Sequence, residues 1–333
     1  MKEGDPELEF IARQIEKTGY PLEIHASVVL EKRDWKVAHS TFYEDFETKS
    51  LREIDIRADR TVERSSLGNA TTPYKIHLRL NIQCKKSDTF AWVFFLTQRK
   101  TDEMATGLRF LDYLYVAKTS SLSRLYSPYP AMLPHIPTLS PGIAKSLKHT
   151  GDLKLVDPTV FRSLAATEQA KTYKEIKMKK AQDSGSTDGY HMIYAAAMTV
   201  LKATDFDFNN AYSIMQFVIN SRFSGAPLPA GAEIGDIQLY LPIILFDGKL
   251  LVWRNGHLEG ADEVLLQAHI LSMGFLVPSP LIIVVQRDHL DDFLKSLNDD
   301  LLVLADRISN SRAALDQEFK SLTQQFSGTT AQT

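Results

Sequence analysis

The chain has 333 residues and a mass of 37.5 kDa, of which 44% are hydrophobic and 24% charged. These proportions are typical of a globular protein and exclude a disordered or fibrous chain. A net charge of -3 and a pI near 6.3 argue against a protein that coats nucleic acid with a basic surface, although they allow a local basic groove. The length fits one large domain or two ordinary ones.

The cysteine content and the N-terminal residues point to an intracellular compartment. Cys84 is the only cysteine, so an intramolecular disulfide is excluded, and the opening residues MKEGDPELEF contain no apolar signal core. These features predict a protein of the reducing cytoplasm. The longest apolar runs, such as residues 237–246, are shorter than a bilayer span and contain Pro242, so we expect no membrane segment.

The first third of the chain predicts two helices followed by three strands. The spacing of apolar residues places the helices at residues 7–18 and 22–33, and the strands at 35–43, 52–58 and 74–86. A polar segment over residues 59–73 is expected to be a loop. This part of the chain therefore predicts a helix that leads into an antiparallel meander.

The middle third predicts mostly helix. Residues 91–96 form a buried apolar run, and residues 126–142 contain too many prolines for a helix or a central strand, which predicts a surface loop. Helices are then expected at residues 159–180, 190–203, with Asp188 as a cap, and 209–221.

The last third predicts the return of strands. Residues 237–246 and 250–254 are expected to form a hairpin through Asp247-Gly248, and residues 280–286 form one more strand. Leucines at helical spacing then predict helix over about residues 289–326. The order of elements is that of an α/β protein.

The predicted strand over residues 74–86 alternates strictly between apolar and polar residues. Ile82 and Cys84 point to one face, which places Cys84 in the core, whereas Gln83 and Lys85 point to the other. On the preceding strand Asp55 occupies the polar face. If the two strands pair, Asp55, Gln83 and Lys85 share one surface. The simplest interpretation of such a surface is the solvated side of an antiparallel sheet.

The residue types on this surface also suit a metal site. Mg²⁺ and Mn²⁺ bind carboxylate, carbonyl and water oxygens, and Asp55 and Gln83 offer two of these ligand types. A neighbouring lysine, Lys85, would help to deprotonate or orient an attacking water and would stabilise charge on a phosphate.

These residues resemble the PD-(D/E)xK nuclease superfamily, and within it the Mrr-like restriction endonuclease domains. The segment REID resembles the first motif, with Asp55 as metal ligand, and QCK the second, with Gln83 and Lys85 in the matching positions. The resemblance implies that the backbone carbonyl of Cys84 completes the ligand set. It also implies a glutamate near the start of the preceding helix, where Glu23 stands; Glu9 is a second candidate.

The resemblance covers about residues 20–95 and implies both a fold and an activity. The fold would be a restriction endonuclease-like core, begun by residues 1–100, interrupted by a mostly helical insertion over 101–235, and completed by strands and terminal helices over 236–333. The activity would be Mg²⁺- or Mn²⁺-dependent hydrolysis of DNA phosphodiester bonds in restriction or defence. The sequence leaves open whether the protein cuts alone; two cuts in a duplex usually imply two active sites, so a homodimer is an expectation only.

Two other interpretations fit the same residues. Most members of the superfamily carry glutamate at the position of Gln83, and a neutral amide binds a divalent cation more weakly than a carboxylate. In the first interpretation the chain is therefore a nuclease-like module that binds DNA or protein without cleaving DNA. In the second interpretation it is a structural or regulatory protein whose polar sheet face is coincidental.

Overall fold

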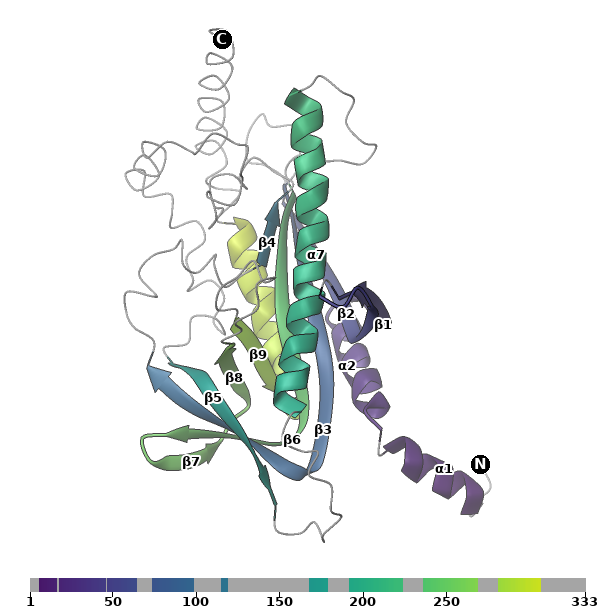
Figure 1. The fold of residues 1–333 in the computed structure, drawn as a ribbon, viewed down its shortest axis with the longest axis vertical. Helices are drawn as coiled ribbons and strands as arrows, with labels where there is room; N and C mark the ends of the chain where they lie inside the picture. Colours follow the sequence, from purple (N-terminus) through teal and green to yellow (C-terminus); the bar gives the residue numbers. More distant parts are fainter. Residues whose placement is uncertain are drawn as a thin grey trace.

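The computed structural model describes residues 6–16, 18–45, 47–64, 74–98, 115–118, 168–178, 192–223, 236–268 and 281–306. In these residues the chain is a mixed α/β protein with one nine-stranded sheet and helices on both of its faces (Figure 1). None of the helices described is long and apolar enough to cross a membrane.

The first third follows the predicted order of elements. Helices α1 (Pro6–Glu16) and α2 (Tyr20–Lys32) precede strands β1 (Lys36–Glu44), β2 (Leu51–Arg64) and β3 (Tyr74–Gln98). The three strands pair antiparallel in chain order, which confirms the predicted meander. Both β2 and β3 are longer than predicted. Strand β2 is extended because its pairing with β3 continues as far as Arg64 with Tyr74, and β3 is extended because its residues 90–98 pair with a strand from the middle third of the chain. Residues 59–64, expected in a loop, therefore belong to β2.

A helix was predicted over residues 159–180, of which the structure describes residues 168–178, and for these residues the prediction is wrong. Residues Glu168–Lys177 form strand β5, which pairs antiparallel with the second half of β3. Side chains alternate along it: Glu175 is buried and accepts a hydrogen bond from the Ile193 amide at 2.8 Å, whereas Lys174 and Ile176 are exposed. Pairing with a distant strand has overridden local helical preference.

The two helices predicted at residues 190–203 and 209–221 are one helix, α7 (Met192–Phe223). The polar residues that separated them in the sequence do not end the helix, because Thr204 and Asp207 are buried against the sheet. The short strand β4 (Tyr115–Lys118) pairs antiparallel with the start of strand β6 (Asp236–Arg254). The proline-rich segment and Asp188 lie outside the described residues.

The hairpin predicted at Asp247-Gly248 is also wrong. Strand β6 (Asp236–Arg254) runs straight through these residues, and the turn into β7 (His257–Gly260) is made by Asn255 and Gly256, at φ 50° and 86°. A glycine is needed at 248 for a different reason: a Cβ there would lie 2.6 Å from the Ser87 carbonyl oxygen of β3.

The remaining elements complete the sheet. Strand β8 (Glu263–Gln267) pairs antiparallel with β9 (Leu281–Gln286), and β9 pairs in parallel with β6, which itself pairs in parallel with β3. The predicted strand over 280–286 is thus confirmed. A short 3₁₀ turn, η5 (Arg287–His289), leads into a helix over residues 290–306, which confirms the described part of the C-terminal helix.

The sheet has a separate apolar core on each face. On one face α2 and the helix over residues 290–306 pack against β3, β6 and β9. On the other face α7 runs along the sheet (Figure 1). Its buried residues share a core with sheet side chains such as Trp92, Phe94 and Phe246. The rings of Trp92 and Phe246 stack at a centroid distance of 3.9 Å. Both faces of the central strands are therefore buried.

A buried polar network fixes α7 to the sheet. The Asp207 carboxylate of α7 is buried, lies 3.1 Å from the Arg57 guanidinium and 3.3 Å from that of Arg79, and accepts a hydrogen bond from the Asn81 amide at 3.1 Å. The Asn81 amide also donates to Thr204 at 3.2 Å. Burial raises the pKa of Asp207, and the two guanidinium groups oppose that shift.

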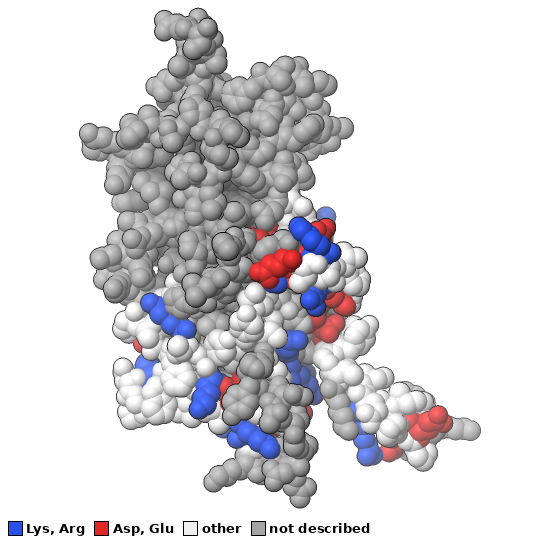
Figure 2. Space-filling model, viewed as in Figure 1, with Lys and Arg blue, Asp and Glu red and all other residues white. Residues whose placement is uncertain are grey.

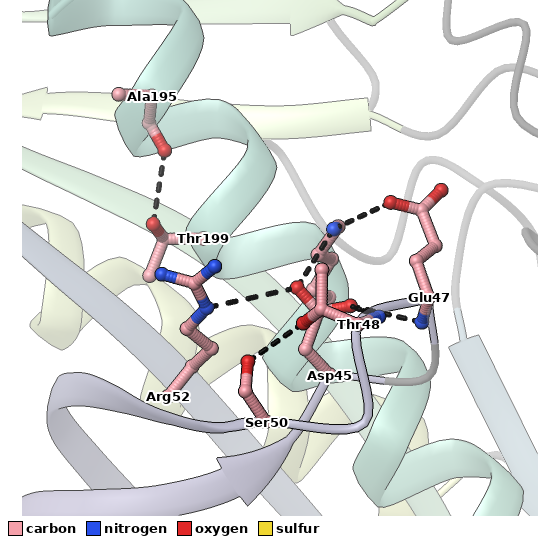
Figure 3. A network of polar contacts seen from close by, with 8 residues as sticks. Asp45, Glu47, Thr48, Ser50, Arg52, Ala195 and Thr199 are labelled. Atoms are coloured by element: carbon pink, nitrogen blue, oxygen red, sulfur yellow. Dashed lines mark hydrogen bonds and ion pairs between the residues drawn. The ribbon is translucent and has the colours of Figure 1, made fainter.

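A second network joins α7 to the turn between β1 and β2 (Figure 3). The Lys202 ammonium donates to Asp45 at 2.8 Å and to Glu47 at 2.7 Å, and the Asp45 carboxylate also accepts the Glu47 amide at 3.0 Å. Burial, with a smaller effect of Asp45, raises the pKa of the adjacent Tyr43 to about 12. The meander and α7 are thereby joined at two places.

We expect Asp207→Ala to lower the free energy of unfolding by about 3–5 kcal/mol, because it leaves two guanidinium groups without their shared buried carboxylate. Urea unfolding followed by circular dichroism measures the change. Thr199→Ala is the control on the same helix: Thr199 is half-buried and its hydroxyl donates only to the Ala195 carbonyl of its own helix, so the value should change by less than about 0.5 kcal/mol. Equal effects from the two substitutions would contradict the role given to Asp207.

Candidate active site at the fork between β2 and β3

The candidate site lies where β2 separates from β3. The pairing of the two strands begins at Ile56 with Ile82, whereas β2 continues to pair with β1 as far as Leu51. Asp55 is therefore the first residue of β2 beyond its pairing with β3. A strand that keeps one neighbour and leaves the other opens a fork in the sheet, and Asp55 stands at its base.

Beyond the paired residues, the Asp55 carboxylate takes the place of a β2 backbone carbonyl as the hydrogen-bond acceptor for β3. One of its oxygens accepts a hydrogen bond from the Cys84 amide at 2.7 Å and another from the Gln83 side-chain amide. Asp55 and Gln83, predicted to share one surface, are thus in direct contact. Cys84 itself is buried in the core, as predicted.

The Gln83 side chain is buried but only half satisfied. It is 6% exposed, and its Nε2 donates to Asp55, while its Oε1 has no hydrogen-bond partner among the described residues. An unsatisfied buried acceptor costs about 1–3 kcal/mol. In regular strand geometry the N–H and C=O of one residue point to the same side. The Cys84 carbonyl is therefore expected on the side of the strand where its amide donates to Asp55.

The charge of Lys85 acts on the pKa of both Asp55 and Glu23. Burial raises the pKa of Asp55, while the Cys84 amide, Lys85 and Gln83 oppose the shift. Burial also raises the pKa of Glu23, with further contributions from Asp55 and Glu53, and Lys85 opposes them. Of the four residues predicted for the site, Asp55 and Gln83 are in direct contact, and Lys85 and Glu23 are linked to Asp55 through their charges.

Glu23 reaches the site from the first turn of α2. Its backbone amide donates to the Gly19 carbonyl at 3.2 Å, which sets it in the opening turn of the helix. The second candidate, Glu9, does not take part: it lies on α1, is exposed and pairs with Arg13 at 3.3 Å. Of the two glutamates, only Glu23 is coupled to Asp55.

Glu53 is a site residue that the sequence analysis did not select. It lies two residues before Asp55 on β2, is exposed, and raises the pKa of both Asp55 and Glu23. The alternation of the strand already put Glu53 and Asp55 on one face, so the spacing of two residues was the available signal.

The thiol of Cys84 is not suited to nucleophilic chemistry. Burial is the main cause that raises its pKa well above the usual value, and the charges of Asp55 and Glu23 add to the shift. A thiolate is the reactive form of cysteine, and this environment disfavours it. The contribution of Cys84 to the fork comes from its backbone.

The donor set fits a hard divalent cation bound through few protein ligands. No three His, Cys, Asp or Glu side chains of the described residues form a metal-binding group. A cation in the fork would therefore use one carboxylate, an amide oxygen, a backbone carbonyl and water, all of which are ligands that Mg²⁺ accepts. The unpartnered Gln83 Oε1 is the observation that favours this arrangement.

Comparisons of the chain with protein-family models, curated proteins and solved structures found no match.

The raised pKa of Asp55 predicts how stability depends on pH. Protonation is easier in the folded state than in the unfolded state, so without metal the free energy of unfolding should fall as pH rises through the raised pKa. Asp55→Asn should remove part of this fall, which thermal melts over a pH series measure. The exposed control Glu9→Gln should leave the profile unchanged; an unchanged profile in Asp55→Asn as well would contradict the assignment.

Proposed function

We propose that the protein is a metal-dependent nuclease that hydrolyses DNA phosphodiester bonds, with its active site in the fork between β2 and β3. The observation that carries the proposal is the contact of Asp55 with the buried Gln83 side chain, whose amide oxygen lacks a partner among the described residues. Lys85 acts on the same carboxylate through its charge. The order of elements, a helix followed by an antiparallel meander, supports a restriction endonuclease-like core. DNA as the substrate follows from the resemblance of the REID and QCK segments.

Asp55, the Gln83 amide oxygen and the Cys84 carbonyl would hold Mg²⁺ or Mn²⁺. In the structure the Gln83 amide nitrogen donates to Asp55. Rotating the amide plane by half a turn would exchange its nitrogen and oxygen and bring the Gln83 amide oxygen beside the Asp55 carboxylate. A bound cation supplies Lewis-acid polarisation of the phosphate and lowers the pKa of a water molecule.

Lys85 and Glu23 provide the protein's own share of the chemistry. The Lys85 ammonium compensates the negative charge of the carboxylates and would stabilise the charge that develops on the phosphate oxygens. It would also orient the attacking water. Glu23, with a raised pKa, is suited to hold a proton and to support the metal or Lys85.

A catalytically inactive nuclease-like module is the second candidate function. The hydrogen bond from Gln83 to Asp55 satisfies the carboxylate without any cation, and this observation favours it. Such a module would bind DNA or protein and would show no metal-dependent cleavage.

We expect Lys85→Ala and Asp55→Ala each to lower the rate of Mg²⁺- or Mn²⁺-dependent plasmid cleavage about 100-fold or more. Lys85→Ala removes the positive charge that stabilises the phosphate, and Asp55→Ala removes the carboxylate ligand of the metal. Cleavage of supercoiled DNA followed on gels measures the rate. Lys249→Ala, an exposed lysine on the neighbouring strand β6, is the matched control and should cleave like the native protein. Full activity in both site variants would rule out this mechanism.

Gln83→Glu should tighten the binding of Mg²⁺ by about tenfold or more, since a carboxylate replaces a neutral amide beside Asp55. Isothermal titration calorimetry on the native protein, Gln83→Glu and Asp55→Ala measures the affinities. Binding lost in Asp55→Ala and tightened in Gln83→Glu is the expected pattern. DNA binding without metal-dependent cleavage in the native protein would favour the inactive module instead.

A further inference from the structure

Helices α1 and α2 carry the largest concentration of exposed apolar side chains in the described part of the chain. Of the fourteen large hydrophobic residues that are exposed there, seven lie within residues 8–28, with exposed fractions of 43–61%. They are Leu8, Phe10, Ile11, Ile15, Tyr20, Ile24 and Val28. We call these seven side chains the α1–α2 surface.

Helix α2 is apolar on two opposite sides. Leu22, Ala26 and Leu30 recur at four residues and are buried in the core, whereas Ile24 and Val28, offset by two residues, are exposed. Residues two apart on a helix point about 200° apart. A helix that is apolar on both sides is typically buried on both sides. The outer side of α2 is therefore suited to packing against another helix.

Helix α1 buries none of its residues in its own chain. It has eleven residues, and isolated helices shorter than about 12–15 residues are marginal in water. Leu8, Ile11 and Ile15 are spaced by three and four residues and form an apolar stripe along it. A helix of this length with an apolar stripe and no buried residue requires a packing partner.

The elbow between the helices prevents α1 from covering α2 of the same chain. The Thr18 hydroxyl donates to the Ile15 carbonyl at 2.6 Å and accepts the Tyr20 amide at 3.3 Å. The Lys86 ammonium donates to the Glu16 carbonyl at 3.1 Å. Figures 1 and 2 show α1 pointing away from the body of the molecule.

We propose that the α1–α2 surface is a homodimer interface in which α1 of each copy packs on the outer side of α2 of the other. The reciprocal arrangement gives both stripes a partner at once, as a two-fold interface requires. It does not depend on the proposed nuclease activity. Because α2 also carries Glu23, the interface would lie beside the candidate sites of both copies.

The size of the surface fits a second copy. If a large apolar side chain presents about 180 Å² when fully exposed, the seven side chains leave roughly 650 Å² on each copy. Two copies would bury about 1,300 Å² together, within the range of roughly 1,200–2,000 Å² found for specific interfaces. An apolar patch of this size also exceeds what most monomers expose, about 300–600 Å².

A charge-exchange experiment tests the reciprocal packing. Size-exclusion chromatography with light scattering on the native 333-residue chain should give twice the 37.5 kDa mass of one chain at micromolar concentration. Ile11→Lys and Ile24→Glu each place a charge in the centre of one stripe, and each should raise the dissociation constant about 100-fold. Leu258→Glu, an equally exposed leucine on β7, is the control and should leave the dimer intact.

Mixing the two variants distinguishes this packing from any other. A heterodimer of Ile11→Lys with Ile24→Glu has one native contact and one contact in which lysine faces glutamate, so the mixture should recover the dimer that neither variant forms alone. Recovery also shows that both variants are folded. A monomeric native chain, a dimer that survives both substitutions, or a mixture that stays monomeric would each overturn the proposal.

Discussion

The amide of Cys84 needs an acceptor at the point where β2 leaves β3, and the Asp55 carboxylate supplies it. This hydrogen bond lets the sheet open without leaving a buried donor unpaired. It also fixes the Asp55 carboxylate in a half-buried position, where burial raises its pKa. The same carboxylate oxygen accepts a second hydrogen bond, from the Gln83 side-chain amide. The geometry of the candidate site is therefore a consequence of how the meander ends.

The polar face of β3 has two roles along its length. Where β2 still pairs with β3, Arg79 and Asn81 contact Asp207 and so hold α7 on the sheet. Beyond the last pair, the same alternation gives Gln83 and Lys85 to the fork. A buried polar network is most stable when every member is satisfied. Neither end of the face reaches this state: Asn81 Oδ1 under α7 and Gln83 Oε1 in the fork both lack a hydrogen-bond partner among the described residues.

Local patterns failed where non-local pairing decided the structure. The lysine-rich residues Glu168–Lys177 fit a helical pattern, but the second half of β3 offers an unpaired edge that they occupy as β5. The Asp247-Gly248 pair is a strong turn signal, yet the glycine serves the close approach of β6 to Ser87. The turn lies at Asn255-Gly256, an equally strong signal that the prediction overlooked.

The sequence by itself determined the helices at the N-terminus, the meander and the face on which each residue of β3 lies, because a period of two in a strand assigns faces without knowledge of its neighbours. It therefore brought Asp55, Gln83 and Lys85 to one surface. The tertiary structure alone decided the contact of Asp55 with Cys84, the burial of Gln83, the approach of Glu23 and Glu53, and the exposure of α1. All of these features depend on where two strands separate and on how helices distant in the sequence pack. The periodic pattern of residues within one strand or helix carries no information about either.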